Sequence, residues 1–329
     1  MQKKHFKKLV IALVLGIVFA SFSADAQIRD TDIVLGISPE NPSPNQTVNA
    51  TLGSHSINLD KTNISWLVNN EKLGGGIGKK SFSFKMGELG YLTVLSATID
   101  TVDGQSIFKT ITLRSTNVDL LWEAYDAYTP PFYRGKALAP SQGKFKVVAI
   151  PSLVSQGEKV NINNLSYAWT KDRNPQVSSS GWGKSSFVFQ NSYLDKGNVV
   201  EVKVSDILGN TGASGKINTT TSNPKILFYE YDSKLGTRWE RTLVDGFTIN
   251  KDGGIIDVEP YFFSPKDIGS SNIAFDWYIN GAKIQTPETK NVLPVRPETS
   301  EPGNATIRVV IENIKTLFQS ASEQIRVNF

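Results

Sequence analysis

The segment NISWLVNNEKL, residues 63–73, decides the fold, because it places one Trp in the middle of a short run of alternating apolar and polar residues. Two later segments repeat it: LSYAWTKDRN at residues 165–174 and IAFDWYINGAKI at residues 273–284. Alternation with a period of two is typical of a strand that buries one face. We therefore expect three copies of one β unit, each with its Trp in the core. These core residues are Trp66, Trp169 and Trp277.

A second alternating strand follows the Trp strand in each copy. The first two copies carry GKKSFSF (residues 78–84) and GKSSFVF (residues 183–189), and the third has the weaker match NVLPV at residues 291–295. Each phenylalanine pair has a spacing of two, which predicts that both rings face the same side of a sheet. The pairs are Phe82 with Phe84 and Phe187 with Phe189.

Each copy ends in a hairpin that carries one acidic residue at a constant spacing. Asp100, Asp206 and Glu312 lie 106 residues apart in both steps. Recurrence in every copy favours a structural role, such as a hydrogen bond to the turn backbone. The alternative is a calcium ligand between domains, and its candidate pairs are Asp100 with Asp103 and Asp119 with Asp126.

The second and third copies also match at their starts. VDLLWEAYD (residues 118–126) aligns with PKILFYEYD (residues 224–232) at the same spacing of 106. Further on, KVVAIP and IIDVEP place Pro151 and Pro260 at corresponding positions. The first copy opens differently, with a Pro-rich turn, so the three units are related but not equivalent.

A central strand with a core Trp, followed by an A-T-I-D-x-x-D-G or V-S-D-x-x-G hairpin, resembles bacterial immunoglobulin-like repeats, and PKD-type modules are similar. The W-D-F-G-D-G run of PKD modules is absent, and so is the Cys pair of antibody-type domains. The resemblance implies an all-β chain of three tandem immunoglobulin-like β-sandwich domains after a signal peptide. We expect the signal peptide at residues 1–26 and the domains at residues 27–115, 116–222 and 223–329.

The first 26 residues have the three parts of a secretory signal peptide. Four lysines precede an apolar run of about 14 residues, which is shorter than the roughly 20 that span a membrane. Ala24-Asp25-Ala26 then predicts cleavage before Gln27, and the alternative is an uncleaved membrane anchor. We expect a secreted, periplasmic or cell-surface protein.

The charge of the mature chain gives no reason to expect a nucleic-acid partner. Without the first 26 residues the chain keeps 31 basic and 30 acidic residues, so its high isoelectric point comes mainly from the targeting segment. Nucleic-acid binding proteins gather basic residues on one face, and no such cluster is visible in the sequence.

Groups for catalysis are scarce. The mature chain has one histidine, His55 in a polar loop, and no cysteine. The segments GGGIGKKS and WGKSS lack the first Gly of a phosphate-binding G-x-x-x-x-G-K-[ST] loop. We therefore expect no enzymatic activity, no catalytic residues, no cofactor and no metal site.

An aromatic insert follows the first strand of the second and third copies. WEAYDAYTPPFYRGKAL (residues 122–138) and FYEYDSKLGTRWERTL (residues 228–243) combine aromatic rings with arginine, a composition enriched at binding hot spots. The alternative is that these rings pack across the joint between domains. The candidate binding patch comprises Trp122, Tyr125, Tyr133, Arg134, Tyr231, Trp239 and Arg241.

These features predict a non-catalytic exported protein that acts in cell-surface adhesion, envelope assembly or protein–protein interaction. Its partner would be a protein or a surface polysaccharide. The alternative function is carbohydrate binding through the aromatic inserts, because such rings stack on sugars. That alternative requires Trp122, Tyr133 and Trp239 to be exposed and coplanar.

Overall fold

The computed structural model describes residues 33–329 except residues 156–157, 208, 210, 300 and 317. The predicted signal peptide, residues 1–26, lies outside the described residues. The described chain is all β, with immunoglobulin-like sandwiches and no α-helix. Short 3-10 turns occur at η2 (Leu59–Lys61), η3 (Ile162–Asn164) and η4 (Val177–Ser179).

Two sheets form in the first part of the chain, and β1 with β2, β3 with β4 and β3 with β6 pair antiparallel. One sheet has the order β1-β2-β5 and the other β4-β3-β6-β7. The strands are β1 (Ile33–Ser38), β2 (Thr47–Ser54), β3 (Asn63–Val68), β4 (Glu71–Ile77), β5 (Ser81–Lys85), β6 (Leu92–Asp100) and β7 (Ser106–Arg114).

The second pair of sheets has the orders β15-β9-β8 and β13-β12-β16-β17, with β14 also pairing with β12. A two-stranded sheet, β10 with β11, accompanies it. The strands are β8 (Asn117–Ala124), β9 (Lys144–Ser152), β10 (Val154–Ser155), β11 (Glu158–Lys159), β12 (Leu165–Lys171), β13 (Asn174–Pro175), β14 (Gly181–Trp182), β15 (Ser186–Gln190), β16 (Gly197–Asp206) and β17 (Gly212–Thr220).

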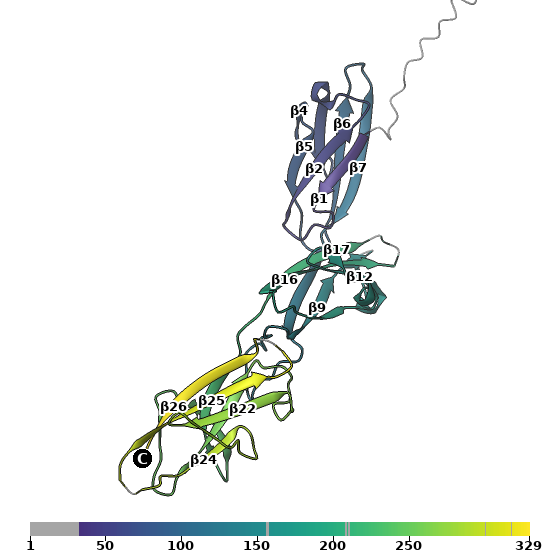
Figure 1. The fold of residues 1–329 in the computed structure, drawn as a ribbon. Helices are drawn as coiled ribbons and strands as arrows, with labels where there is room; N and C mark the ends of the chain where they lie inside the picture. Colours follow the sequence, from purple (N-terminus) through teal and green to yellow (C-terminus); the bar gives the residue numbers. More distant parts are fainter. Residues whose placement is uncertain (1–32, 156–157, 208, 210, 300, 317) are drawn as a thin grey trace, which may run out of the picture. The chain divides into compact units, whose positions relative to one another are not determined.

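The third pair has the orders β19-β18-β21-β24 and β20-β26-β25-β22-β23, and Figure 1 shows β22, β25 and β26 side by side. The strands are β18 (Lys225–Asp232), β19 (Gly236–Thr242), β20 (Phe247–Thr248), β21 (Gly254–Tyr261), β22 (Ile273–Ile279), β23 (Ala282–Ile284), β24 (Val292–Val295), β25 (Asn304–Asn313) and β26 (Ser320–Asn328).

By its contacts the chain divides into two compact units. One contains most of residues 33–113, and the other contains residues 114–329 together with residues 41–46 and 85–92. The second and third pairs of sheets thus belong to one unit. The predicted division into domains at residues 115 and 222 stays a prediction.

The repeated tryptophans lie in the cores, as predicted. Trp66, Trp169 and Trp277 are 0%, 1% and 0% exposed. Each indole Nε1 donates a hydrogen bond to a backbone carbonyl just before a strand of the facing sheet. These bonds are Trp66 to Lys79 at 2.8 Å, Trp169 to Lys184 at 2.8 Å and Trp277 to Lys290 at 2.9 Å. One side chain therefore links the two sheets of each pair.

The paired phenylalanines and two of the three recurring acids also match their predicted places, whereas the predicted role of Glu312 stays a prediction. Phe187 and Phe189 are buried in the second core, and Phe82 stacks on Trp66 at 5.7 Å. Asp100 accepts a hydrogen bond from the Ser106 hydroxyl, and Asp206 accepts one from the Thr211 backbone. These two acids support the hairpin turns.

Pro151 and Pro260, which were predicted to correspond, pair with positions of the preceding strand that are two residues apart in the alignment of the two copies. Pro151 lies opposite Val118, whereas Pro260 lies opposite Ile226, the residue that aligns with Leu120. The prediction was wrong here because the segments between the paired strands differ in length, and local motif matching does not fix the register of two strands.

Replacement of a core Trp tests the link between the sheets. Trp169→Phe should lower the free energy of unfolding by about 2 kcal/mol, because it removes apolar volume and leaves the Lys184 carbonyl without its donor. Urea denaturation measures the loss. Trp182→Phe is the matched control, since Trp182 is 50% exposed, and equal effects of the two substitutions would contradict the structural role of Trp169.

Candidate binding surfaces

The predicted aromatic patch divides into two separate places in the structure. Where the insert after β8 packs on the third pair of sheets, the Tyr133 ring contacts Tyr261 and the Trp239 ring contacts Phe132. Trp122 lies on β8 and packs on the core of the second pair, 5.2 Å from the Phe145 ring. Tyr125 is exposed near Lys266, Arg134 and Arg241 are exposed, and Tyr231 is half-buried in β18. Their predicted binding role stays a prediction.

The first place centres on Tyr128 and strand β21. Ile256 and Val258 of β21 enter the core, so Asp257 and Glu259 point to the opposite face of the sheet. Tyr128 covers that face: its hydroxyl donates to Glu259 Oε2 at 2.6 Å, and its backbone bonds to Phe263 and Phe262 at 2.6 and 2.8 Å.

These residues form the joint cluster. We define it as Tyr128, Tyr133, Tyr229, Trp239, Asp257, Glu259, Tyr261 and Phe262.

The two carboxyl groups of the joint cluster are almost fully buried. Asp257 and Glu259 are 2% and 4% exposed and share a hydrogen bond. Asp257 also accepts from Thr237 Oγ1 at 2.5 Å and from Asn291 Nδ2 at 2.8 Å. Burial raises the pKa of Asp257, and it raises the pKa of Glu259 to about 7.

Several aromatic rings at the joint cluster make edge-to-face contacts. Tyr133 meets Tyr261 and Phe262 at interplanar angles of 76° and 73°, and Trp239 meets Phe132 at 64°. Trp239 is half-buried. Tyr133 and Trp239 thus use ring edges and faces in contacts across the joint.

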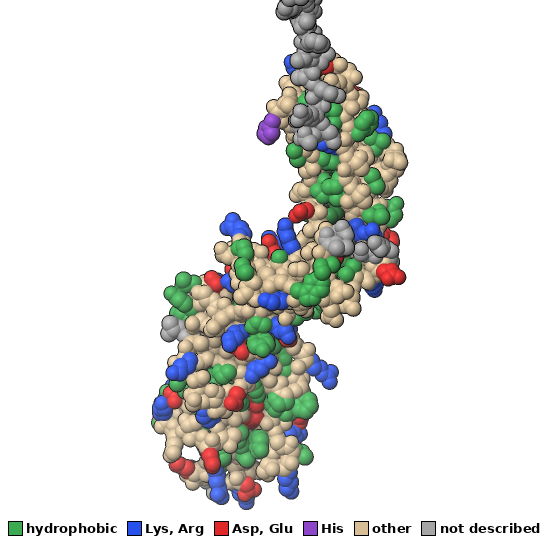
Figure 2. Space-filling view, turned by 90° about the vertical axis from the view of Figure 1, so that its right-hand side faces the viewer, with side chains coloured by type: hydrophobic (Ala, Val, Ile, Leu, Met, Phe, Trp, Pro, Cys, Tyr) green, Lys and Arg blue, Asp and Glu red, His purple; other side chains and the backbone are tan. Residues whose placement is uncertain are grey.

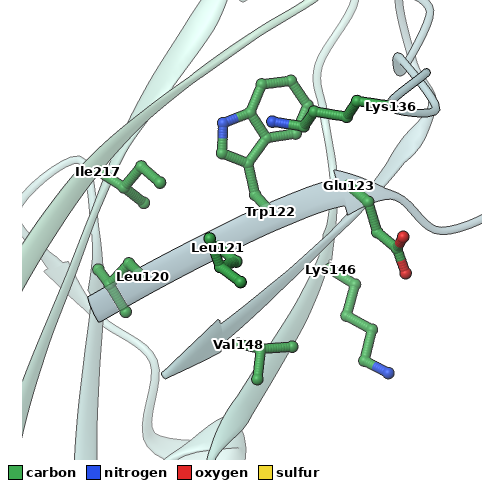
Figure 3. A pocket seen from close by; sticks show the side chains of 8 residues that line it. All are labelled: Leu120, Leu121, Trp122, Glu123, Lys136, Lys146, Val148 and Ile217. Atoms are coloured by element: carbon green, nitrogen blue, oxygen red, sulfur yellow. The ribbon is translucent and has the colours of Figure 1, made fainter. Parts of the chain in front are cut away.

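The second place is an open groove beside strand β8, with a volume of about 480 Å³. Figure 3 shows the Trp122 ring and the Lys136 amine together on one side of β8, with Glu123, Lys146 and Val148 on the other. We call it the Trp122 groove. It is lined by Leu120, Leu121, Trp122, Glu123, Lys136, Lys146, Val148 and Ile217.

A lysine is held at this groove by an aromatic ring. Lys136 Nζ lies 3.1 Å from the centre of the Trp122 ring, the arrangement of a cation–π contact. Partial burial lowers the pKa of Lys136, and the nearby Glu123 carboxylate opposes this effect. Among the residues that the structure describes, no carboxylate is within salt-bridge distance of this amine.

Apolar side chains continue from the groove over the solvent-facing side of the β8–β9 pair. Leu121 lies opposite Val148, and Asp119 lies opposite Ile150. Leu121 and Ile150 are 60% and 47% exposed. Contiguous exposed apolar side chains of this kind are typical of interaction surfaces.

Charged side chains are intermixed elsewhere. On the face drawn in Figure 2, lysine, arginine and acidic side chains alternate over the third pair of sheets.

The structure shows the surroundings of the one histidine of the mature chain and of one candidate calcium ligand. His55 is exposed in a bend, and the Asp126 carboxylate accepts hydrogen bonds from the Lys144 backbone and the Ser264 hydroxyl. Within residues 33–329, apart from the few positions left undescribed, no group of three His, Cys, Asp or Glu residues could hold a metal ion. In that same part of the chain, no helix has the length and apolar character to cross a membrane.

The sequence patterns did not reveal some of the residues that form the joint cluster and the Trp122 groove. Lys136 and Ile217 reach the Trp122 groove from segments far apart in the chain. Asp257 and Glu259 had a detectable signal: in IIDVEPY, two acids alternate with apolar residues inside a strand. That pattern indicates a polar face, although the burial of this face depends on the distant Tyr128.

No family model and no curated protein matches the chain. Solved structures with immunoglobulin-like or fibronectin-like domains are similar in fold. Fibronectin(III)-like modules of Clostridium thermocellum CbhA share 8% identity at a TM-score of 0.28, covering 57% of this chain and 94% of theirs.

Two other solved structures cover 90% of this chain at 11% identity. Three N-terminal domains of the bacteriophage RB49 outer capsid protein Hoc match at a TM-score of 0.26 over 97% of their length. Bacteroides ovatus SGBP-B, solved with a mixed-linkage heptasaccharide, matches at 0.21 over 70% of its length. Likeness at these TM-scores carries no information on function.

The buried Glu259 predicts a stability that depends on pH. Its pKa is about 7 in the folded chain and 4.5 in its ordinary state, so the folded chain binds this proton more tightly. The resulting stabilisation is complete below pH 4.5 and is lost as the pH rises through 7. The wild-type free energy of unfolding should fall by about 2 kcal/mol more than that of Glu259→Gln between roughly pH 5 and 8.

Urea denaturation at the two pH values measures this difference. Glu298→Gln, at an exposed position, is the matched control and should keep the wild-type pH dependence. The same pH dependence in Glu259→Gln would show that Glu259 is not responsible.

Proposed function

We propose that this chain is an exported, non-catalytic binding protein that presents an interaction surface in cell-surface adhesion, envelope assembly or another protein–protein contact. The Trp122 groove is the observation that carries the proposal. It combines exposed apolar side chains with an amine that makes no salt bridge in the described residues, and both features favour a ligand that supplies apolar surface and negative charge.

Export and the repeat class belong to the same proposal. The basic, apolar and small-residue parts of residues 1–26 support secretion to the periplasm, the medium or the cell surface. Bacterial immunoglobulin-like or PKD-like repeats are the class that the Trp strand and its hairpin favour.

A surface polysaccharide is the alternative partner. Phe132 favours it, because this large apolar side chain is 82% exposed and has a positive φ of 64°, a conformation that bulky residues rarely adopt. The edge-to-face contacts of Tyr133 with Tyr261 and of Trp239 with Phe132 weigh against it, because this alternative requires freely exposed, coplanar rings.

Cleavage of the signal peptide can be tested directly. The protein recovered from its native host should begin at Gln27, as measured by mass spectrometry of its N-terminal peptide. Recovery from the cell interior with Met1 or the initial lysines still attached would contradict export.

Capture from envelope and secreted fractions tests the binding function. The mature chain should retain a partner that Lys136→Glu loses, because the substitution places a carboxylate where the groove offers an amine. Lys251→Glu, at an exposed position of the third pair of sheets, is the matched control. If the wild type and both variants retain the partner equally, the Trp122 groove is not the binding site. Retention of a polysaccharide that only Phe132→Asn loses would favour the alternative function.

A further inference from the structure

The Trp122 groove lies along the free edge of a sheet. In the order β15-β9-β8, strand β8 is at the edge. The Tyr125 N–H donates to the Lys144 carbonyl at 2.7 Å and extends the β8–β9 ladder. Because alternate residues of an antiparallel strand bond to the same neighbour, the backbone groups of Leu120 and Trp122 point away from β9.

Beyond one contact, this edge has no backbone partner in the described residues. The Ala124 N–H donates to the Ala137 carbonyl at 3.0 Å. Before Ala124, the backbone groups of Trp122 and Leu120 that point away from β9 make no hydrogen bond to a described residue, whereas at the start of β8 the Gly215 backbone packs against the Val118 carbonyl. An exposed edge with unpaired N–H and C=O groups is able to pair with another strand.

In the third pair of sheets, the edge that corresponds to the free edge of β8 is paired with another strand. Phe228 of β18 aligns with Trp122, and its carbonyl accepts a hydrogen bond from the Leu243 N–H at 2.8 Å. Strand β19 precedes Leu243 and runs antiparallel to β18, with Tyr229 opposite Thr242. Leu243 packs against the core of this pair. The same edge of the same fold therefore carries an added strand with an apolar side chain turned inward.

The charged side chains of the Trp122 groove favour a binding segment that carries negative charge. Two lysines, Lys136 and Lys146, line it with one carboxylate, Glu123. The Lys136 amine lies on the inner side, over the Trp122 ring. An occupant with an acidic side chain on that side would complement it.

We propose that the Trp122 groove binds an extended segment of a partner protein, which adds to β8 as an antiparallel strand. An acidic side chain of the segment pairs with Lys136, and an apolar side chain two residues later lies against Leu120 and Ile217. Residues two apart in a strand face the same side, so both enter the groove. Backbone bonds provide affinity and the side chains provide specificity. This inference rests on the proposed function and names its partner class.

A short peptide tests strand addition on the mature chain, residues 27–329. The probe is labelled acetyl-Thr-Glu-Thr-Leu-Thr amide, and its affinity is measured by fluorescence anisotropy. We expect binding, and we expect Lys136→Glu to weaken it roughly tenfold while Lys251→Glu leaves it unchanged. The reversed order, Thr-Leu-Thr-Glu-Thr, should bind more weakly, because its acid and its apolar residue exchange places.

Backbone N-methylation supplies a control on the unaltered protein. The Glu and Leu amides of the bound peptide would face β8, so methylating them should abolish binding, whereas methylating the Thr amides should not. Equal effects of the two methylation patterns would overturn strand addition. If Lys136→Glu loses its captured partner but no peptide binds, the proposed function stands and this inference fails.

A second copy of the chain is the competing occupant. Analytical ultracentrifugation distinguishes it: the mature wild-type chain should be monomeric. A dimer that Lys136→Glu dissociates would overturn the assignment to a partner protein.

Discussion

One hydrogen bond type fixes the relation between the two sheets of each pair: a buried indole N–H that donates to a backbone carbonyl of the facing sheet. The chain has no cysteine, so no disulfide joins its sheets. Trp66, Trp169 and Trp277 each fill the space between the sheets, and each N–H reaches a carbonyl. Since a buried N–H without an acceptor costs free energy, the bond specifies where the second sheet lies as well as filling the core.

With the sheets fixed in this way, the differences between the second and third pairs lie at their edges. After β18, the insert forms β19 and covers the edge of its own sheet. After β8, the corresponding insert instead reaches the third pair, where Tyr128 bonds to the Phe263 and Phe262 backbone and to Glu259. Apart from the hydrogen bond between Ala124 and Ala137, the insert after β8 makes no backbone bond to the edge of that strand in the described residues.

The parts of this structure that depend on local sequence could be predicted, and those that depend on distant contacts could not. The Trp strands, the paired phenylalanines and the turn at Asn280-Gly281 follow from alternation and turn chemistry, and both turn residues have positive φ. The separation of Trp122 from Tyr133 and Trp239 depends on contacts such as Tyr128 with Glu259, which are 131 residues apart. No pattern within the insert reveals which face of another sheet it covers.

The joint cluster and the Trp122 groove share one short segment of backbone. The Tyr133 ring packs on Tyr261 and Phe262, and its hydroxyl donates to the Lys136 carbonyl at 3.2 Å. The side chain of that same Lys136 lies over the Trp122 ring. Polar contacts at the joint, including the buried carboxyl pair, are costly unless fully bonded, so they specify one position for the insert. That position also places the Lys136 amine over the Trp122 ring, so the contacts at the joint and the geometry of the Trp122 groove depend on each other.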